Sequence, residues 1–155
     1  MKRKISIIIP NFNEERTIIK ILEKIQSNQS NKMDFEVIVV DDASTDNSKD
    51  TLLSKKHLYN TLLINKKNFG KGYCVKRGLE KATGEYVIIQ DADLEYDPKD
   101  YDKFINVFLK FDADGVIGSR IIFTEYTRAH NFFNKLGNKI LTFVFNLLNN
   151  KTFTD

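Results

Sequence analysis

Four acidic side chains follow a short apolar run and are the residues best suited to chemistry. The run is Tyr86–Ile89, and after Gln90 the acids occupy alternate positions: Asp91, Asp93, Glu95 and Asp97. A buried strand cannot hold so many carboxylates, because each unpaired charge would cost several kcal/mol or lose its charge. The acids must therefore lie where the strand leaves the core, and a divalent cation that carries a phosphate is the natural partner.

The spacing Asp91-Ala92-Asp93 is a DXD arrangement. Alternate residues of an extended chain point the same way, so we expect Asp93 and Glu95 to share a face and to bind Mg²⁺ or Mn²⁺. Magnesium usually takes one or two protein carboxylates together with water and substrate phosphates, which suits a nucleotide diphosphate. The alternative is a solvated turn before a helix, whose amino end favours acids.

Polar residues also follow other apolar runs. Asp41-Asp42 closes Phe35–Val40, whose β-branched residues are typical of a strand buried on both faces. Asn68–Gly72 is a glycine-containing turn before a helical segment, and it is a candidate anion site with Lys71 as the countercharge. The alternative for the two aspartates is helix capping and solvation.

Strands and helices alternate along the chain. Helical signals follow Pro10, span Lys71–Thr83 with Gly84 closing that helix, and begin again at Pro98. Apolar runs predict strands at Ile5–Ile9, Phe35–Val40, Thr61–Ile64, Tyr86–Ile89 and Gly115–Gly118. This alternation predicts an α/β fold with a largely parallel sheet and helices on both faces. Four strand ends, including the one before Arg120, then place polar groups on one edge, where ligands bind in such sheets.

Two helix starts are predicted from capping residues. Asn11 and Glu14 are spaced like a capping box for the first helix. Ser44 or Thr45 is the expected cap of the second.

Composition indicates one soluble domain over residues 1–155. Cys74 is the single cysteine, which excludes a disulfide within the chain and favours a packing role in a reducing compartment. The apolar run after the amino terminus is too short for a signal peptide, and no window reaches the length of a membrane span, so we expect a cytoplasmic protein. The net charge of +3 comes from residues 119–155, which are too sparse in charge to predict nucleic acid binding.

Taken together, the motifs resemble glycosyltransferase family 2. They are IIIPNFNEE, VVDDASTDNS, NFGKGYCVKRGLEKATGEYVIIQDADLEYDP and GSR, in that order, and the likeness covers residues 5–155. The resemblance is strongest to the dolichol-phosphate mannosyltransferase and bacterial polyprenyl-phosphate glycosyltransferase branch. It implies the GT-A fold of nucleotide-diphospho-sugar transferases, a Rossmann-like α/β/α sandwich with a mostly parallel central sheet.

The resemblance also implies roles for individual residues. Asp93 and Glu95 would hold the metal, Arg120 would grip the diphosphate, and Asp91, Asp93 and Arg120 would be catalytic. Phe12 stands where tyrosine is usual, and Glu95 where the dolichol enzymes have glutamine. Adding Lys71 from its turn, the residues expected to bind the nucleotide sugar are Pro10, Phe12, Glu14, Val40, Asp42, Lys71, Asp91, Ala92, Asp93 and Arg120.

The last part of the chain differs in character. Residues 128–150 are rich in Phe and Leu, with Lys135 and Lys139 between them, which predicts an amphipathic helix. That helix would lie in the membrane interface on the cytoplasmic face, or pack on the sheet or a partner. Relatives continue beyond Asp155, so we expect a truncated domain with a complete donor site and an incomplete acceptor site.

The expected function is a metal-dependent, inverting transfer of a sugar from a nucleotide-diphosphate sugar to a polyprenyl phosphate. Two alternatives stay open. One is a soluble family member with a glycan acceptor, active in polysaccharide or glycoprotein synthesis. The other is a non-catalytic module that only binds nucleotide sugars.

Overall fold

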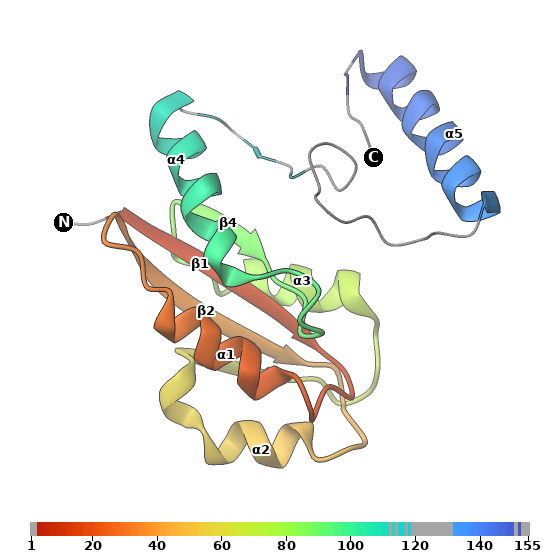
Figure 1. Cartoon of the computed structure of the whole chain (residues 1–155). Coiled ribbons are helices and arrows are strands. Elements are labelled where there is room, and N and C mark those ends of the chain that lie inside the picture. The colour runs from red at the N-terminus through yellow and green to blue at the C-terminus, as the bar shows by residue number, and fades with distance from the viewer. Residues whose placement is uncertain are drawn as a thin grey trace. The chain divides into compact units, whose positions relative to one another are not determined.

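The computed structural model describes residues 3–111, 113, 115, 116, 118, 132–150 and 152 of the 155-residue chain. The chain divides into two units, Met1–Asp112 and Ala113–Asp155, and each is described by itself. In the first unit four parallel strands form one sheet in the order β3-β2-β1-β4 (Figure 1). The predicted α/β class and the parallel sheet are confirmed.

The strands begin and end close to their predicted positions. Their bounds are β1 Arg3–Asn11, β2 Met33–Asp41, β3 Thr61–Ile64 and β4 Tyr86–Ile89. The register pairs Ile8 with Ile38 on one side and with Ile89 on the other. Of the fifth predicted strand, the three described residues Gly115, Val116 and Gly118 belong to no helix or strand.

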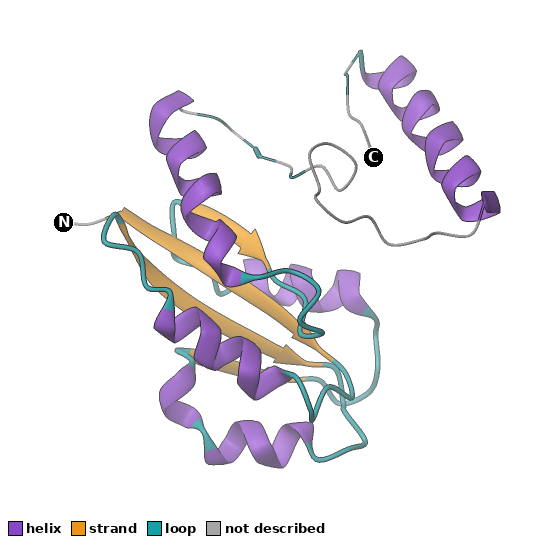
Figure 2. Ribbon diagram, viewed as in Figure 1, coloured by secondary structure: helices purple, strands orange, loops and turns teal. Residues whose placement is uncertain are grey.

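Helices cover both faces of the sheet (Figure 2). One face packs against α1 Ile18–Ser27, α2 Ser48–Ser54 and α4 Tyr101–Phe111, and the short 3₁₀ turns Lys56–Leu58 and Pro98–Asp100 lie next to α2 and α4. The opposite face packs against α3 Lys71–Leu79.

The core sits on both sides of β2. Val37 and Val39 belong to the cluster under α1, whereas Ile38 and Val40 pack against Cys74 of α3. Alternate residues of a strand point to opposite faces, so a continuous run of β-branched residues can only be satisfied between two layers. The prediction that this strand is buried on both faces is confirmed.

Three local predictions were wrong. Asn11 is the last residue of β1, and α1 begins only at Ile18, so Asn11 and Glu14 do not form a capping box. Helix α2 begins at Ser48 after Asn47, so neither Ser44 nor Thr45 caps it. Helix α3 ends at Leu79 rather than Thr83.

The differences at α2 and α3 share one cause. Ser44 donates a hydrogen bond to Asp41 (2.6 Å), and Gly84 donates one to the hydroxyl of Ser6 on β1 (2.9 Å). In both cases a contact with a strand replaces the local helix contact that the sequence pattern favoured.

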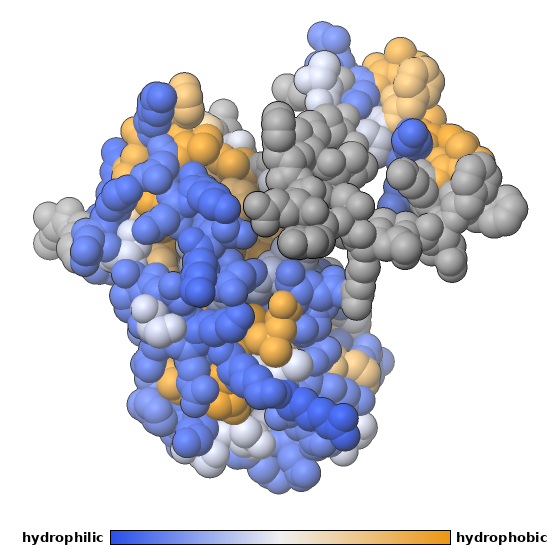
Figure 3. Space-filling model, in the orientation of Figure 1, coloured by the Kyte–Doolittle hydropathy of each residue, from blue (hydrophilic) through white to orange (hydrophobic). Residues whose placement is uncertain are grey.

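The second unit contains α5, Phe132–Asn149. Its apolar side chains are largely exposed, including Leu141, Leu147 and Leu148, and they run along the helix (Figure 3). Polar residues recur at Asn138, Thr142 and Asn146, four apart, so the helix is amphipathic. No described helix has the length and hydropathy needed to span a membrane.

Helix α3 lies very close to β1. A Cβ atom at Gly78 would come within 2.4 Å of Cγ2 of Ile8, which is fully buried. Only glycine therefore lets the helix approach the sheet at this point.

We expect Gly78→Ala to lower the free energy of unfolding by about 1–3 kcal/mol, because Ile8 has no free space into which to move. Gly72→Ala on the same helix is the matched control, since nothing lies within 4 Å of the added methyl group. The control should raise the free energy of unfolding by about 0.5–1 kcal/mol through helix propensity. Urea unfolding of both variants measures the difference, and equal midpoints would contradict this packing.

Candidate functional site

A pocket of about 260 Å³ opens at the carboxyl ends of all four strands. Each strand end or following loop contributes to its wall: Pro10, Asn11, Phe12, Asp42, Asn68, Gly70, Lys71, Cys74 and Asp91. Ligands of open parallel sheets bind at this edge, where the strand order changes direction. The volume is near the lower end of the range for small-molecule sites.

Two neighbouring aspartates at the end of β2 hold the loops around the pocket. Asp41 is fully buried, and its carboxylate accepts hydrogen bonds from the side chains of Asn11 (2.8 Å) and Ser44 (2.6 Å). The hydroxyl of Ser44 also accepts from the backbone N–H of Asn13 (3.0 Å). Asp41 thereby joins the loop after β1 to the loop after β2.

Asp42 holds the loop between β3 and α3 to the end of β2. Asp42 is 3% exposed, and its carboxylate accepts from the Asn65 side chain (2.6 Å) and from the backbone N–H groups of Phe69 (3.0 Å) and Gly70 (2.7 Å). Burial alone would raise the pKa of Asp42, but the hydrogen bonds from Asn65, Phe69 and Gly70 outweigh it, and the pKa lies below its ordinary value. The charged form is therefore the one that the fold stabilises.

The loop held by Asp42 delivers the start of α3 to the pocket. Gly70 has a φ of +87°, which residues with a side chain rarely adopt, and it directly precedes the helix. No side chain caps this helix start, and Gly70 and Lys71 line the pocket, so the positive amino end of the helix lies at the pocket wall. The first residue, Lys71, makes an ion pair with Asp91 (Nζ–Oδ1 2.6 Å).

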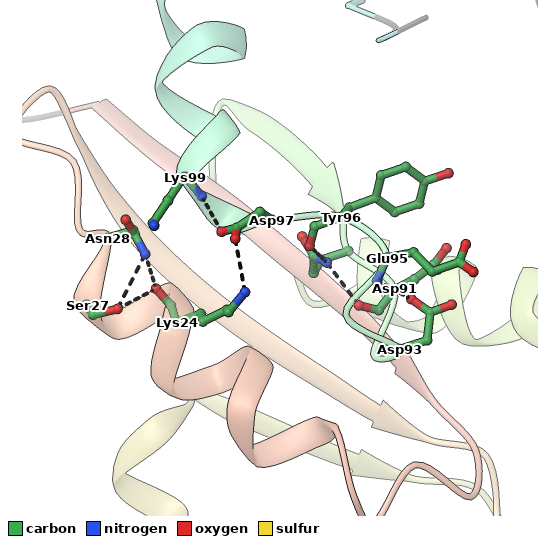
Figure 4. A network of polar contacts seen from close by, with 10 residues as sticks. Lys24, Ser27, Asn28, Asp91, Asp93, Glu95, Tyr96, Asp97 and Lys99 are labelled. Atoms are coloured by element: carbon green, nitrogen blue, oxygen red, sulfur yellow. Dashed lines mark hydrogen bonds and ion pairs between the residues drawn. The ribbon is translucent and has the colours of Figure 1, made fainter. Parts of the chain in front are cut away.

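The acidic residues after β4 lie in a compact turn (Figure 4). Gln90 is buried and donates to the backbone oxygens of Asp91 (2.9 Å) and Tyr96 (3.2 Å), while its own oxygen accepts from the Tyr101 hydroxyl (2.7 Å). The premise of an extended chain after β4 was wrong. Leu94 has a φ of +66° and packs against the core, which bends the chain into the turn.

The turn separates the four acids into two pairs. Asp91 meets Lys71, and Asp97 meets Lys24 (2.9 Å), so these two are matched by lysines. Asp93 and Glu95 are exposed, and the backbone N–H of Glu95 donates to Asp93 (3.0 Å). Their side chains point to the same side of the turn in Figure 4.

The fit of a divalent cation can be judged from this donor set. Among the residues that the structure describes, no three acidic, histidine or cysteine side chains are placed to hold a metal ion by themselves. Mg²⁺ and Mn²⁺ are nevertheless compatible with Asp93 and Glu95, because carboxylate oxygens are their preferred ligands. Such a site needs ligand phosphates and water to complete it.

The structure brings half of the predicted nucleotide-sugar residues together in one pocket. Pro10, Phe12, Asp42, Lys71 and Asp91 line it. Their roles in binding, like that of Asp93 in binding and catalysis, remain predictions.

Three other predicted residues lie elsewhere. Val40 and Ala92 are buried in the core, and the carboxylate of Glu14 accepts from the hydroxyl of Thr17 (2.5 Å). None of the three lines the pocket, and neither does Asp93, which is exposed on the turn after β4. Arg120 lies outside the described residues, so its predicted contact with a diphosphate stays a prediction.

Sequence reasoning missed two of the residues in the wall. Asn11 stands between two predicted residues, and Cys74 was assigned to packing, which its complete burial confirms. Burial, followed by the nearby charge of Asp42, raises the pKa of the Cys74 thiol to about 12. The thiol is therefore neutral and unreactive at physiological pH.

We expect Asp42→Asn to lower the free energy of unfolding by about 1–3 kcal/mol at neutral pH, because two backbone N–H groups lose a charged acceptor. A depressed folded pKa contributes stability above the unfolded value and loses it as pH falls through the folded value. The difference from wild type should therefore shrink below about pH 4. Urea unfolding at both pH values measures it, with the exposed Asp50→Asn of α2 as the control. If the difference in free energy of unfolding between wild type and Asp42→Asn is as large below about pH 4 as at neutral pH, the charge of Asp42 does not stabilise the fold.

The chain is similar in sequence to known proteins. Residues 6–151 match the family described as Glycosyl transferase family 2. The chain is 31% identical over 137 residues to a dolichol-phosphate mannosyltransferase of Pyrococcus furiosus, covering 88% of this chain and 38% of that protein. It is 29% identical over 142 residues to an undecaprenyl-phosphate 4-deoxy-4-formamido-L-arabinose transferase of Proteus mirabilis, covering 89% and 42%. The chain thus spans about two fifths of the length of these relatives.

A solved structure shares the fold. Glucosyl-3-phosphoglycerate synthase from Mycobacterium tuberculosis, in complex with Mn²⁺, uridine diphosphate and glucosyl-3-phosphoglycerate, matches with a TM-score of 0.58 and 25% identity, covering 70% of this chain and 40% of that one. The expected GT-A fold is confirmed. By the family match and the fold, this chain belongs to glycosyl transferase family 2.

Proposed function

We propose that this chain transfers a sugar from a nucleotide-diphosphate sugar to a polyprenyl phosphate, with Mg²⁺ or Mn²⁺ as the cofactor. The pocket at the strand ends carries the proposal. There the uncapped start of α3 and the ammonium group of Lys71 offer positive charge next to the carboxylate of Asp91. Diphosphates bind readily at helix amino ends with a nearby cation, and carboxylates accept ribose hydroxyl and base N–H groups.

The two relatives support the choice of acceptor. Their names give different sugars, mannose and a formamido-arabinose, but both name a polyprenyl-type phosphate. The acceptor class is therefore what these relatives have in common, and the sugar is what varies. We assign the acceptor class to this chain and leave the sugar open.

The reaction would be a single displacement with inversion. A phosphate oxygen of the acceptor attacks the anomeric carbon, and the bond from that carbon to the diphosphate breaks, with the electron pair leaving on the diphosphate. A bound divalent cation would offset the charge that develops there. Lys71 and Arg120 would contribute further positive charge. The acceptor phosphate is already anionic, so it needs little help from a general base.

Nucleotide binding should depend on the metal through Asp93. We expect wild type to bind uridine or guanosine diphosphate at least about tenfold more tightly with Mn²⁺ than with EDTA, because Asp93 and Glu95 would hold a cation that supplies positive charge for the phosphates. Asp93→Asn should remove most of that difference. Isothermal titration calorimetry measures it.

The control for Asp93→Asn is Asp34→Asn. Asp34 is exposed near the start of β2, at the opposite end of the sheet. This variant should behave as wild type. A full Mn²⁺ effect in Asp93→Asn would remove the metal assignment, and no binding of either nucleotide would contradict the donor site.

We also propose that α5 lies in the membrane interface and brings the chain to its lipid acceptor. Leu141 and Leu148 are 69% and 78% exposed, so α5 has an exposed apolar surface whose burial away from water would be favourable. Lys139 lies at the edge of the polar side, where anionic headgroups would meet it. A peripheral position of this kind needs no membrane-spanning helix.

Leu147→Asp tests this placement. The introduced charge falls on the apolar side of α5 and should reduce partitioning into phosphatidylglycerol vesicles about tenfold in a flotation assay. Asn138→Asp introduces the same charge on the polar side and should change partitioning by less than about twofold. If wild type does not bind vesicles but transfers sugar to a soluble acceptor, the soluble alternative replaces the lipid acceptor.

A further inference from the structure

A chain of polar groups leads away from the pocket to the last turn of α3. Asp42 accepts from the Asn65 side-chain N–H₂ group (2.6 Å), and the Asn65 side-chain oxygen accepts from the guanidinium group of Arg77. Arg77 also donates to the backbone oxygen of Ile64 (3.3 Å). Neither Asn65 nor Arg77 lines the pocket, whereas Asp42 does.

The orientation of the Asn65 amide follows from its two neighbours. The guanidinium group of Arg77 can only donate, and the ionised carboxylate of Asp42 can only accept. The amide oxygen must therefore face Arg77, and the amide nitrogen must face Asp42. Asn65 is 5% exposed and Asp42 is 3% exposed, so water is a poor substitute for either contact.

We propose that Asn65 and Arg77 are positioning residues for the nucleotide pocket, acting through Asp42. Arg77 fixes the Asn65 amide, and the amide fixes one oxygen of the Asp42 carboxylate. The carboxylate in turn holds the N–H groups of Phe69 and Gly70, and with them the loop before α3. This inference rests on the proposed function, because it assumes that the pocket takes a nucleotide-diphosphate sugar.

The protein itself occupies the acceptor sites of Asp42. A carboxylate has about four of them, and the donors are the Asn65 side chain, the backbone N–H groups of Phe69 and Gly70, and the Cys74 thiol. The carboxylate therefore acts by holding the loop at the pocket wall. A displaced Asn65 would let the carboxylate turn and would loosen this loop contact.

Replacing the Asn65 amide by a carboxyl group gives a pH-dependent test. In Asn65→Asp one oxygen still accepts from Arg77, but the other faces Asp42, so one of the two carboxyl groups must take up a proton. The groups facing this position are Asp42 from the end of β2 and Cys74 and Arg77 from α3. Arg77 stays charged and Cys74 stays neutral throughout, so the two carboxyl groups alone titrate.

We expect Asn65→Asp to bind UDP-glucose or GDP-mannose about tenfold more weakly than wild type at about pH 8, and to approach wild type at about pH 5.5. Asn65→Leu should bind weakly at both pH values, because it can neither donate nor titrate. Wild type in the same buffers is the reference, and calorimetry with Mn²⁺ gives the ratio. Equal affinity of Asn65→Asp and wild type at both pH values would overturn the proposal, and so would a loss of affinity that does not recover in acid.

A second measurement needs no ligand. Arg77→Met should raise the amide hydrogen exchange rates of Phe69 and Gly70 about tenfold without a similar rise in β2, because the loop loses its anchor before the sheet does. Lys76→Met, an exposed neighbour on α3, is the matched control and should leave these rates unchanged. Unchanged rates in Arg77→Met would overturn the inference.

The two measurements also separate the inference from the proposed function. Wild type that binds neither sugar nucleotide contradicts the donor site, while the exchange rates still decide whether Asn65 and Arg77 position the loop. Wild type that binds, with variants that bind equally well, contradicts only the inference.

Discussion

Two adjacent carboxylates in a nearly dry environment are the constraint on which the rim of this sheet depends. Asp41 and Asp42 end a strand that is buried on both faces, so each carboxyl group needs hydrogen-bond donors there. Since neighbouring strand residues point to opposite sides, each aspartate finds its donors in a different loop. The requirement to satisfy two buried carboxyl groups thus orders the loops from three strands and shapes the pocket between them.

The acidic turn after β4 is also held by contacts of its carboxylates, but here the partners are lysines. Asp91 and Asp97 meet lysines that belong to α3 and α1, which ties the turn to helices on both faces of the sheet. Asp93 and Glu95 remain exposed between those two anchors. Asp93 adds a contact within the turn, because its carboxylate accepts from the backbone N–H of Glu95 (3.0 Å).

The positions of the strands could be predicted from the sequence, because long β-branched runs can be satisfied only in a covered sheet. The edge where polar groups gather could be predicted as well. The sequence did not suffice for contacts between residues far apart in the chain. Asn65 directly follows a predicted strand, the same signal that singled out Asp42. Its partner Arg77 stands on the following helix, and nothing in the local pattern indicates their contact. The turn at Leu94 was missed because a leucine with positive φ has no local signature and is set by tertiary packing.

The central strands have a consequence for the chain before it folds. Ile5–Ile9 and Val37–Val40 are short, β-rich segments of the type that pair with other copies when exposed, and their parallel partners are distant in sequence, so they find them late. Arg3 and Lys4 precede the first segment, Pro10 follows it, and Asp41 and Asp42 follow the second. In the unfolded chain these residues act as gatekeepers against aggregation. The aspartates that order the pocket in the native state thus also protect the nascent chain.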